Sequence, residues 1–86
     1  MSYRVRISPT ARPDLESRLP HAVAAAALEF IHGPLAENPH RVGKPLKRDL
    51  EGLWAARRGQ YRVVYEVLED EVVSVVRVAH RADVHY

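Results

Sequence analysis

Three arginines, Arg57, Arg62 and Arg77, lie in segments whose side chains otherwise alternate as they do in β-strands. Two-residue turns at Gly59-Gln60 and Glu69-Asp70 would place Arg62 opposite Arg57 on one neighbouring strand and opposite Arg77 on the other. Like charges directly opposite one another destabilise a sheet. A bound anion reverses that effect, because guanidinium groups bind phosphate through paired hydrogen bonds. The pattern therefore predicts a phosphate-binding row, and its alternative is a solvated face whose arginines pair with nearby acids.

The same register assigns the other side chains of the three strands to two faces. A slip of one residue would scatter the arginine row. Ala55, Val64 and Val75 are expected beside the arginines, and His80 shares the parity of the opposite face, so we interpret it as structural. That opposite face is predicted to be the core face, and it consists of Trp54, Ala56, Tyr61, Val63, Tyr65, Val67, Val72, Val76 and Val78.

Strand and helix signals precede these three strands. Residues 3–8 alternate and predict a short strand, and helices are expected to begin near Thr10 and at Pro20. Gly33-Pro34 should interrupt the second helix, and the prolines and cations of residues 33–52 indicate a mainly extended connector, with a further helical turn at residues 34–38 as the alternative. The order β-α-α-β-β-β predicts an α+β fold, a small antiparallel sheet with two N-terminal helices packed on one face. The apolar stripe of the second helix is Val23, Ala24, Ala27, Leu28 and Ile31.

Length and composition limit the classes to which the protein can belong. The 86 residues predict a single domain over residues 1–86. Cysteine is absent, which excludes disulfides and thiolate metal sites and favours a reducing compartment. No segment has the length and apolarity of a membrane span, so we expect a soluble cytoplasmic protein. The five histidines lack paired acids or a third ligand at suitable spacing, so neither a metal nor a cofactor is expected.

Positive charge is concentrated in the centre of the chain. Residues 41–62 contain seven Lys/Arg and two acids, a balance of +5, whereas residues 63–86 contain two Arg and five acids, a balance of −3. Residues 1–40 are neutral, so the sum is the net charge of +2. A local cationic field of this kind favours polyanionic partners, and its alternative is a basic but merely solvated loop.

The segments "SPTARPDL", "GKPLK", "LWAARR" and "YRVVY", with "HR" and a terminal tyrosine at the end, resemble the RelE/ParE superfamily of bacterial toxins. The likeness covers nearly the whole chain. It implies the RelE fold, which is similar to that of compact microbial ribonucleases. It also implies a toxin of a type II toxin–antitoxin system, an endoribonuclease that cleaves mRNA on the ribosome. The implied partners are mRNA, the ribosome and a cognate antitoxin, which silences the toxin in a heteromeric complex.

The resemblance assigns roles to individual residues. Arg62 matches the phosphate-binding arginine of the third strand, and Arg81 matches the arginine of the last strand. Tyr86 stands where many members have a C-terminal catalytic tyrosine. The ending "HY" is similar to the YoeB branch, in which the penultimate histidine is catalytic, and here that residue is His85.

Metal-free RNA cleavage of this kind requires three things. The 2′-hydroxyl must lose a proton, the phosphorane must be neutralised, and the leaving 5′-oxygen must gain a proton. Arg57, Arg62 and Arg81 are expected to neutralise charge, because an arginine side chain cannot serve as a base at neutral pH. The proton transfers are then assigned to His85, and to Tyr86 if nearby cations lower the pKa of its hydroxyl group.

Basic residues outside the catalytic set are expected to bind the RNA backbone without taking part in chemistry. They are Lys44, Lys47 and Arg48 on the connector and Arg77 on the last strand.

Two departures from the family pattern keep other functions open. Leu53 and Ala55 occupy the positions of the two catalytic lysines of RelE proper. The "GKPLK" segment lacks the glutamate base of the YoeB branch, so Asp49 or Glu51 would have to replace it. The alternatives are therefore a ParE-like inhibitor of DNA gyrase without nuclease activity, and an inactive RNA-binding module.

Overall fold

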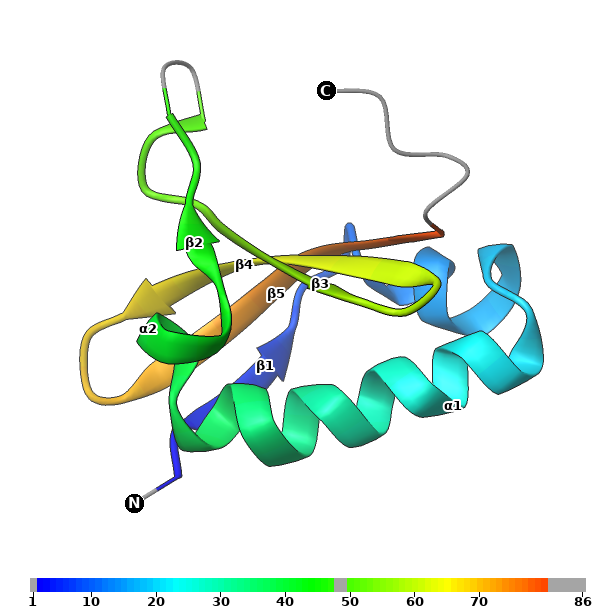
Figure 1. The fold of residues 1–86 in the computed structure, drawn as a ribbon, viewed down its shortest axis with the longest axis horizontal. Helices are drawn as coiled ribbons and strands as arrows, with labels where there is room; N and C mark the ends of the chain where they lie inside the picture. The colour runs from blue at the N-terminus through cyan, green and yellow to red at the C-terminus, as the bar shows by residue number, and fades with distance from the viewer. Residues whose placement is uncertain (1, 48–49, 81–86) are drawn as a thin grey trace.

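The computed structural model describes residues 2–47 and 50–80, and its centre is a five-stranded sheet in the order β1-β5-β4-β3-β2 (Figure 1). Helix α1 runs along one face of this sheet, so the predicted α+β class is confirmed. The elements are β1 (Arg4–Ile7), the π-helical segment η1 (Asp14–Arg18), α1 (His21–Phe30), the π-helical segment η2 (Ile31–Leu35), α2 (Pro39–Val42), β2 (Lys44–Pro45), β3 (Trp54–Arg58), β4 (Tyr61–Leu68) and β5 (Val72–His80).

Two features of the sheet correct the sequence-based prediction. β1 pairs with β5 in the parallel direction, so the sheet is mixed and not wholly antiparallel. No hairpin joins these two strands, so no turn in the sequence specifies their relative direction. The expected extended connector also contains α2 and the two-residue strand β2, which adds a fifth strand beside β3.

The register of β3 and β4 is the predicted one. Arg57 lies opposite Arg62 and Arg58 lies opposite Tyr61, across a two-residue turn in which Gly59 has a φ of +52°. A positive φ costs glycine little because it has no Cβ atom.

The register of β4 and β5 differs from the prediction. Leu68 lies opposite Val72 instead of Glu71, and Asp70 and Glu71 adopt positive φ angles of 61° and 56° in the longer loop. A β-bulge follows, because Val64 pairs with Arg77 whereas Tyr65 pairs with Val75. These two shifts place Ala79, and not Arg77, opposite Arg62.

The same shifts change the membership of the core. Val73 and Val75 are fully buried in the main apolar cluster, whereas the predicted core residues Val72 and Val76 are only partly buried and lie outside it. The other predicted core-face residues of the three strands do pack in or against this cluster: Trp54, Ala56, Tyr61, Val63, Tyr65, Val67 and Val78.

The helical part begins close to the predicted position and continues further than the sequence predicts. Helical residues begin at Arg12, close to the predicted start near Thr10, and the π-helical segment η1 follows from Asp14. Ser8 and Thr10 bond to β5 just before it: the Ser8 N–H donates to Val75 O and the Thr10 hydroxyl to Val76 O. Gly33-Pro34 does not interrupt the second helix, since the π-helical segment η2 continues through Pro34 and buries Leu35 completely. Of the stripe predicted for the second helix, Val23, Ala24 and Ala27 of α1 and Ile31 of η2 are buried, and Leu28 is half-buried.

Tyr65 attaches α2 to the sheet. Its hydroxyl is buried and donates a 2.6 Å hydrogen bond to Pro39 O at the start of α2, and burial raises the pKa of Tyr65 to about 12. Gly43, which follows α2, passes directly over this ring. A Cβ atom on Gly43 would overlap the Tyr65 hydroxyl and lie 2.9 Å from Ala55 O, so the close approach depends on the missing side chain.

None of the helices in the described ranges has the length and apolarity that crossing a membrane requires.

We expect Tyr65→Phe to change the pH dependence of folding. The unfolded chain ionises this hydroxyl near pH 10, whereas burial keeps it protonated in the folded protein up to about pH 12. Its contribution to stability is therefore complete below pH 10 and is lost as the pH rises toward 12. Near neutral pH, Tyr65→Phe should cost about 1 kcal/mol for the lost hydrogen bond. Between pH 10 and 12 its free energy of unfolding, measured with urea, should fall less than that of the parent. Parallel declines would contradict this prediction.

We expect Gly43→Ala to destabilise the protein by about 1–3 kcal/mol, because the added methyl group overlaps its neighbours. The φ of Gly43 is −125°, an ordinary extended value, so the loss would come from packing alone. Gly33→Ala is the matched control, since no atom lies within 4 Å of its Cβ position. Combining Gly43→Ala with Tyr65→Phe removes the overlapping hydroxyl, so the double variant should lose less than the sum of the single losses. Additive losses would show that the two residues are not in contact.

Candidate functional site

A pocket of about 350 Å³ opens where α2, β2, β3 and β4 meet. Three cations from three adjacent strands line it: Lys44 of β2, Arg57 of β3 and Arg62 of β4. Lys44 lies opposite Ala55, two residues from Arg57, so all three side chains share the sheet face that α1 does not cover. The remaining lining residues are Val42, Gly43, Leu46 and Ala55.

The two arginines of the pocket differ in exposure. Arg57 is exposed, whereas Arg62 is half-buried and its Nε atom is buried. Because they are a directly opposed pair on neighbouring strands, their guanidinium groups extend from adjacent points of the sheet. Among the residues that the structure describes, no acidic side chain lines this pocket. Positive charge in such a partly enclosed space attracts anions more strongly than it does on an open surface.

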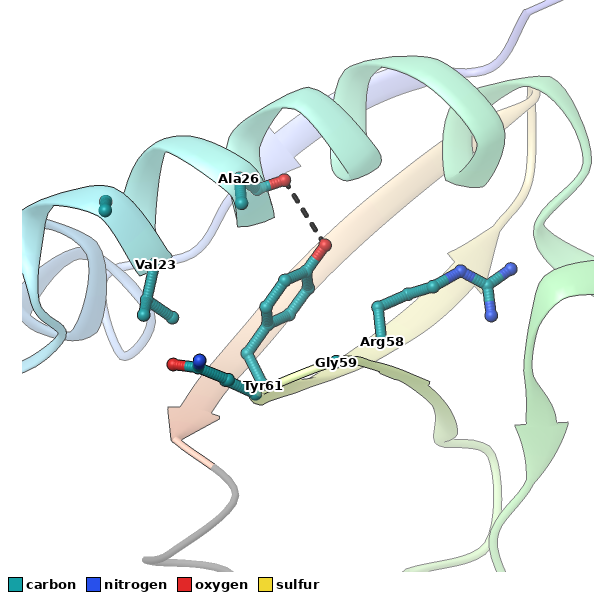
Figure 2. Close-up of a pocket in the computed structure, with 7 residues that line it drawn as sticks. Val23, Ala26, Arg58, Gly59 and Tyr61 are labelled. Atoms are coloured by element: carbon teal, nitrogen blue, oxygen red, sulfur yellow. Dashed lines mark hydrogen bonds between the residues drawn. The ribbon is translucent and has the colours of Figure 1, made fainter.

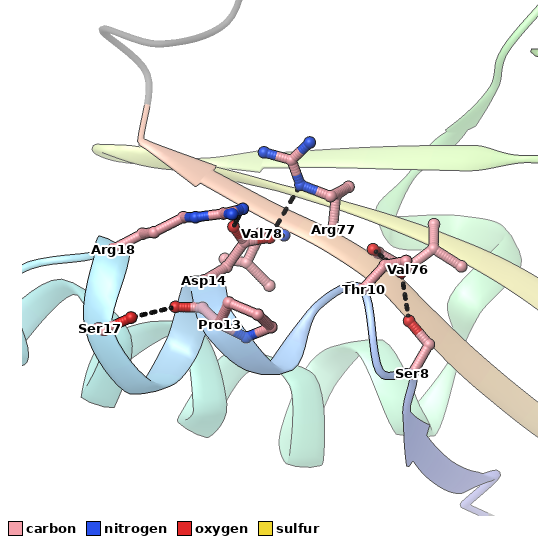
Figure 3. Close-up of polar contacts among 9 residues, drawn as sticks. All are labelled: Ser8, Thr10, Pro13, Asp14, Ser17, Arg18, Val76, Arg77 and Val78. Carbon is pink, nitrogen blue, oxygen red and sulfur yellow. Dashed lines mark hydrogen bonds and ion pairs between the residues drawn. The ribbon is translucent and has the colours of Figure 1, made fainter.

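The prediction of a row of three arginines is therefore confirmed for Arg57 and Arg62 and wrong for Arg77. Arg77 lies opposite Val64 instead of Arg62, and it does not line the pocket. Its Nε atom is 2.9 Å from Asp14 Oδ2, at the edge of β5 that β1 leaves uncovered (Figure 3). The cause is the longer loop and the bulge of the second hairpin, which together displace Arg77 by two positions.

The other residues that the sequence predicted have different outcomes. Lys47 is exposed and does not line the pocket, although its neighbour Leu46 does. His80 pairs with the buried Tyr61, so its predicted place on the core side of the sheet is confirmed. The remaining predicted residues, Arg48, Arg81, His85 and Tyr86, lie outside the described residues, as does Asp49. Their roles stay predictions.

Sequence reasoning missed the role of Asp14. Its side chain is 98 % buried, and Oδ2 accepts hydrogen bonds from the Val78 N–H and from Arg77 Nε, each at 2.9 Å. Oδ1 lies 3.3 Å from Arg18 Nη1 (Figure 3). In the sequence Asp14 looks like an ordinary acid in the first turn of a helix, and the parallel pairing of β1 with β5 would be needed to place it.

A second pocket, of about 430 Å³, lies between α1 and the β3–β4 turn (Figure 2). Arg58 lies 4.8 Å above the Phe30 ring, and the Tyr61 hydroxyl donates a 3.2 Å hydrogen bond to Ala26 O. Burial raises the pKa of Tyr61, so this hydroxyl is a poor proton donor or acceptor for chemistry near neutral pH. Arg57 and Arg58 are thus neighbours in sequence that serve opposite faces of the sheet. The lining residues are Ala22, Val23, Ala26, Arg58, Gly59, Gln60 and Tyr61.

Trp54 and Tyr65 pack as the sequence predicts. Tyr65 is fully buried, and Trp54 packs against the core with its ring 5.1 Å from that of His40 on α2. Neither residue lines the pocket that contains Arg62.

Comparison with known proteins agrees with this fold and with these motifs. The family model of the ParE toxin of the type II toxin–antitoxin system parDE matches residues 5–85. Toxin RelE of Mycobacterium tuberculosis is 53% identical over 81 residues, which cover 93% of this chain and 82% of that protein. Toxin RelG of the same organism is 51% identical over 87 residues, which cover 99% and 98% of the two chains.

A solved structure is similar at the same level. The toxin–antitoxin complex RelBE2 of M. tuberculosis contains a chain that superimposes with a TM-score of 0.90 and 48% identity, over 96% of this chain and 95% of that chain. The sequence motifs, the sheet order and these similarities agree. The chain therefore belongs to the RelE/ParE superfamily of toxins of type II toxin–antitoxin systems.

Proposed function

We propose that this protein is an endoribonuclease toxin that cleaves mRNA without a metal ion, in association with the ribosome. The observation that supports this most is the directly opposed pair Arg57 and Arg62 in one pocket with Lys44. A phosphodiester bound there would meet guanidinium groups from two strands and an ammonium group from a third. Such an arrangement suits a phosphorane, whose extra negative charge develops only during the reaction.

The pocket supplies electrostatic stabilisation but no base among its described residues. An arginine does not release its proton at neutral pH, and the remaining lining residues apart from Lys44 are apolar or glycine. The proton transfers are therefore assigned to His85 and Tyr86, with Arg81 as a further cation. In this proposal His85 takes the 2′-hydroxyl proton, and Tyr86 or the imidazolium of His85 donates to the leaving 5′-oxygen.

Lys44 could supply the positive charge of a family lysine that this chain lacks. The resemblance places a catalytic lysine at the position of Ala55, and the register of β2 places Lys44 directly opposite Ala55. Both residues line the pocket, so an ammonium group reaches the same region from the neighbouring strand. This geometry favours retained activity over an inactive RNA-binding module.

The partner that silences the toxin in this proposal is a cognate antitoxin, forming a heteromeric complex in the cytoplasm. The similar M. tuberculosis protein was solved in a toxin–antitoxin complex. An antitoxin that covers the pocket of Arg57 and Arg62 would need acidic side chains there, because buried cations must be paired.

A second candidate is a ParE-like inhibitor of DNA gyrase. It is favoured by the ParE description of the matching family model and by the apolar residues Leu53 and Ala55 at the two lysine positions. A gyrase inhibitor acts by binding protein, so it needs no phosphate site of this kind.

We expect Arg62→Ala to reduce mRNA cleavage by about 10²–10³-fold, because one preorganised cation is lost from the transition state. Growth inhibition should be lost with it, while circular dichroism and thermal unfolding remain close to those of the parent. Arg58→Ala is the matched control: it removes the same charge four residues away, from the opposite face of the sheet. Primer extension of transcripts after induction measures the cleavage. Full cleavage by Arg62→Ala would refute the role of Arg62, and absence of cleavage by the parent would refute the nuclease. DNA-damage signalling with intact transcripts would establish the gyrase inhibitor.

A further inference from the structure

Asp14 holds two arginines from different elements at one edge of the sheet. Its buried carboxylate contacts Arg77 Nε at 2.9 Å from β5 and Arg18 Nη1 at 3.3 Å from η1 (Figure 3). The Val78 N–H fixes the carboxylate itself through a third contact. Asp14 is thus anchored to the backbone of β5 and cannot follow the arginines if they move.

This cluster keeps a positive charge and accessible donors. Two guanidinium groups and one carboxylate sum to +1, and Asp14 accepts one N–H of each arginine, although a guanidinium has five. The side chains of Arg18 and Arg77 are 62% and 51% exposed, whereas that of Asp14 is 2% exposed. The negative charge is therefore buried behind the two cations, and solvent meets mainly the cations.

The cluster is separate from the pocket but lies on the same side of the sheet. Arg77 and Val64 are opposed, and so are Ala79 and Arg62, so Arg77 shares the face of Arg62. Arg57 on β3 and Arg77 on β5 are two strand spacings apart, about 10 Å, whereas Arg62 on β4 is a diagonal neighbour of Arg77, about 7–8 Å away. Small apolar residues, Val64 and Ala79, lie between the two cationic sites. Asp14 holds the Arg77 guanidinium at the outer edge of β5, and Arg77 does not line the pocket. Two phosphates of one strand of nucleic acid therefore fit the two sites better than a single phosphate does.

We propose that Arg77 and Arg18, positioned by Asp14, form a second phosphate-binding subsite that takes a different phosphodiester of the same single strand from the one in the Arg57–Arg62 pocket. The proposal rests on the proposed function in that its ligand is RNA. Asp14 is a positioning residue: it touches no phosphate and acts through Arg77. The alternative is an ion-pair cluster that serves folding alone.

Arg77→Gln tests the subsite directly, because glutamine keeps a side-chain N–H for the buried Asp14 carboxylate. Asp14 also keeps its contacts with Arg18 and with the Val78 N–H, so the fold should stay intact. The ligand is a short single-stranded 2′-O-methyl RNA, which cannot be cleaved, compared with a 2′-O-methyl dinucleotide that fills only the pocket. We expect the variant to bind the longer ligand about tenfold more weakly and to reduce the slope of log K against log salt by about 0.7. Its affinity for the dinucleotide should not change.

Arg4→Gln is the matched control. It makes the same change of charge on β1, beside the start of β5, where Arg4 pairs with Val72, five residues before Arg77. If Arg77→Gln and Arg4→Gln change the affinity and the salt slope equally, Arg77 adds only general charge and the subsite is refuted.

Asp14→Asn separates positioning from net charge. The substitution makes the cluster more positive, so electrostatics alone would strengthen binding of the longer RNA. If Asp14 positions Arg77, the variant should instead bind it several-fold more weakly, with the dinucleotide affinity unchanged. Stronger binding would refute the positioning role. Should Asp14→Asn not fold, the pair Arg18→Gln and Arg77→Gln replaces it: their effects should be non-additive if they share one phosphate, and additive if they do not.

The subsite and the nuclease can fail separately. If the parent cleaves mRNA but Arg77→Gln binds the longer RNA normally, the subsite is wrong and the nuclease stands. If the salt slope depends on Arg77 but no transcript is cleaved, the subsite stands and the nuclease is wrong. A parent protein that binds neither ligand refutes the subsite, and the nuclease is then decided by transcript cleavage alone.

Discussion

Two guanidinium groups held directly opposite one another, Arg57 and Arg62, are the constraint on which the site depends. Their repulsion opposes this pairing, so another part of the structure must fix the register. The neighbouring pair on the other face, Ala56 and Val63, is almost completely buried, and a slip of one residue would expose it. Burial on one face thus imposes a cationic pair on the other. This is the kind of local conflict that folded proteins retain at functional sites.

The wall of the pocket depends on a second contact across the sheet. The buried Tyr65 hydroxyl donates a hydrogen bond to the carbonyl oxygen of Pro39, the first residue of α2. Gly43 passes over the same ring, immediately before β2 begins at Lys44. The position of Lys44 beside the arginines therefore follows from packing beneath it, on the core side. At the opposite edge, Asp14 completes the hydrogen bonding of β5 where β1 ends, and in doing so it holds Arg77.

Much of the fold could be predicted from the sequence, and the errors have identifiable causes. The first hairpin followed from clear alternation around a glycine turn. The second could not be placed because "VVSVV" is apolar at both parities, so the pairs Val72/Val76 and Val73/Val75 suit a core face equally well. The bulge and the positive φ angles of the loop have no strong signal in the sequence, and they moved Arg77 out of the predicted row. Of the site, the pair of Arg57 and Arg62 was predictable, whereas the role of Asp14 depends on long-range parallel pairing.

The most direct test of the site is whether Arg57 and Arg62 bind the same phosphate. Titration of a ¹⁵N-labelled protein with a non-cleavable dinucleotide, observed at the arginine Nε–H resonances, measures this. Arg57 and Arg62 should shift together along one binding curve, while Arg58 on the opposite face stays unchanged. If Arg57 and Arg62 follow different curves, or if Arg58 shifts as much as they do, the two guanidinium groups do not form a common phosphate site.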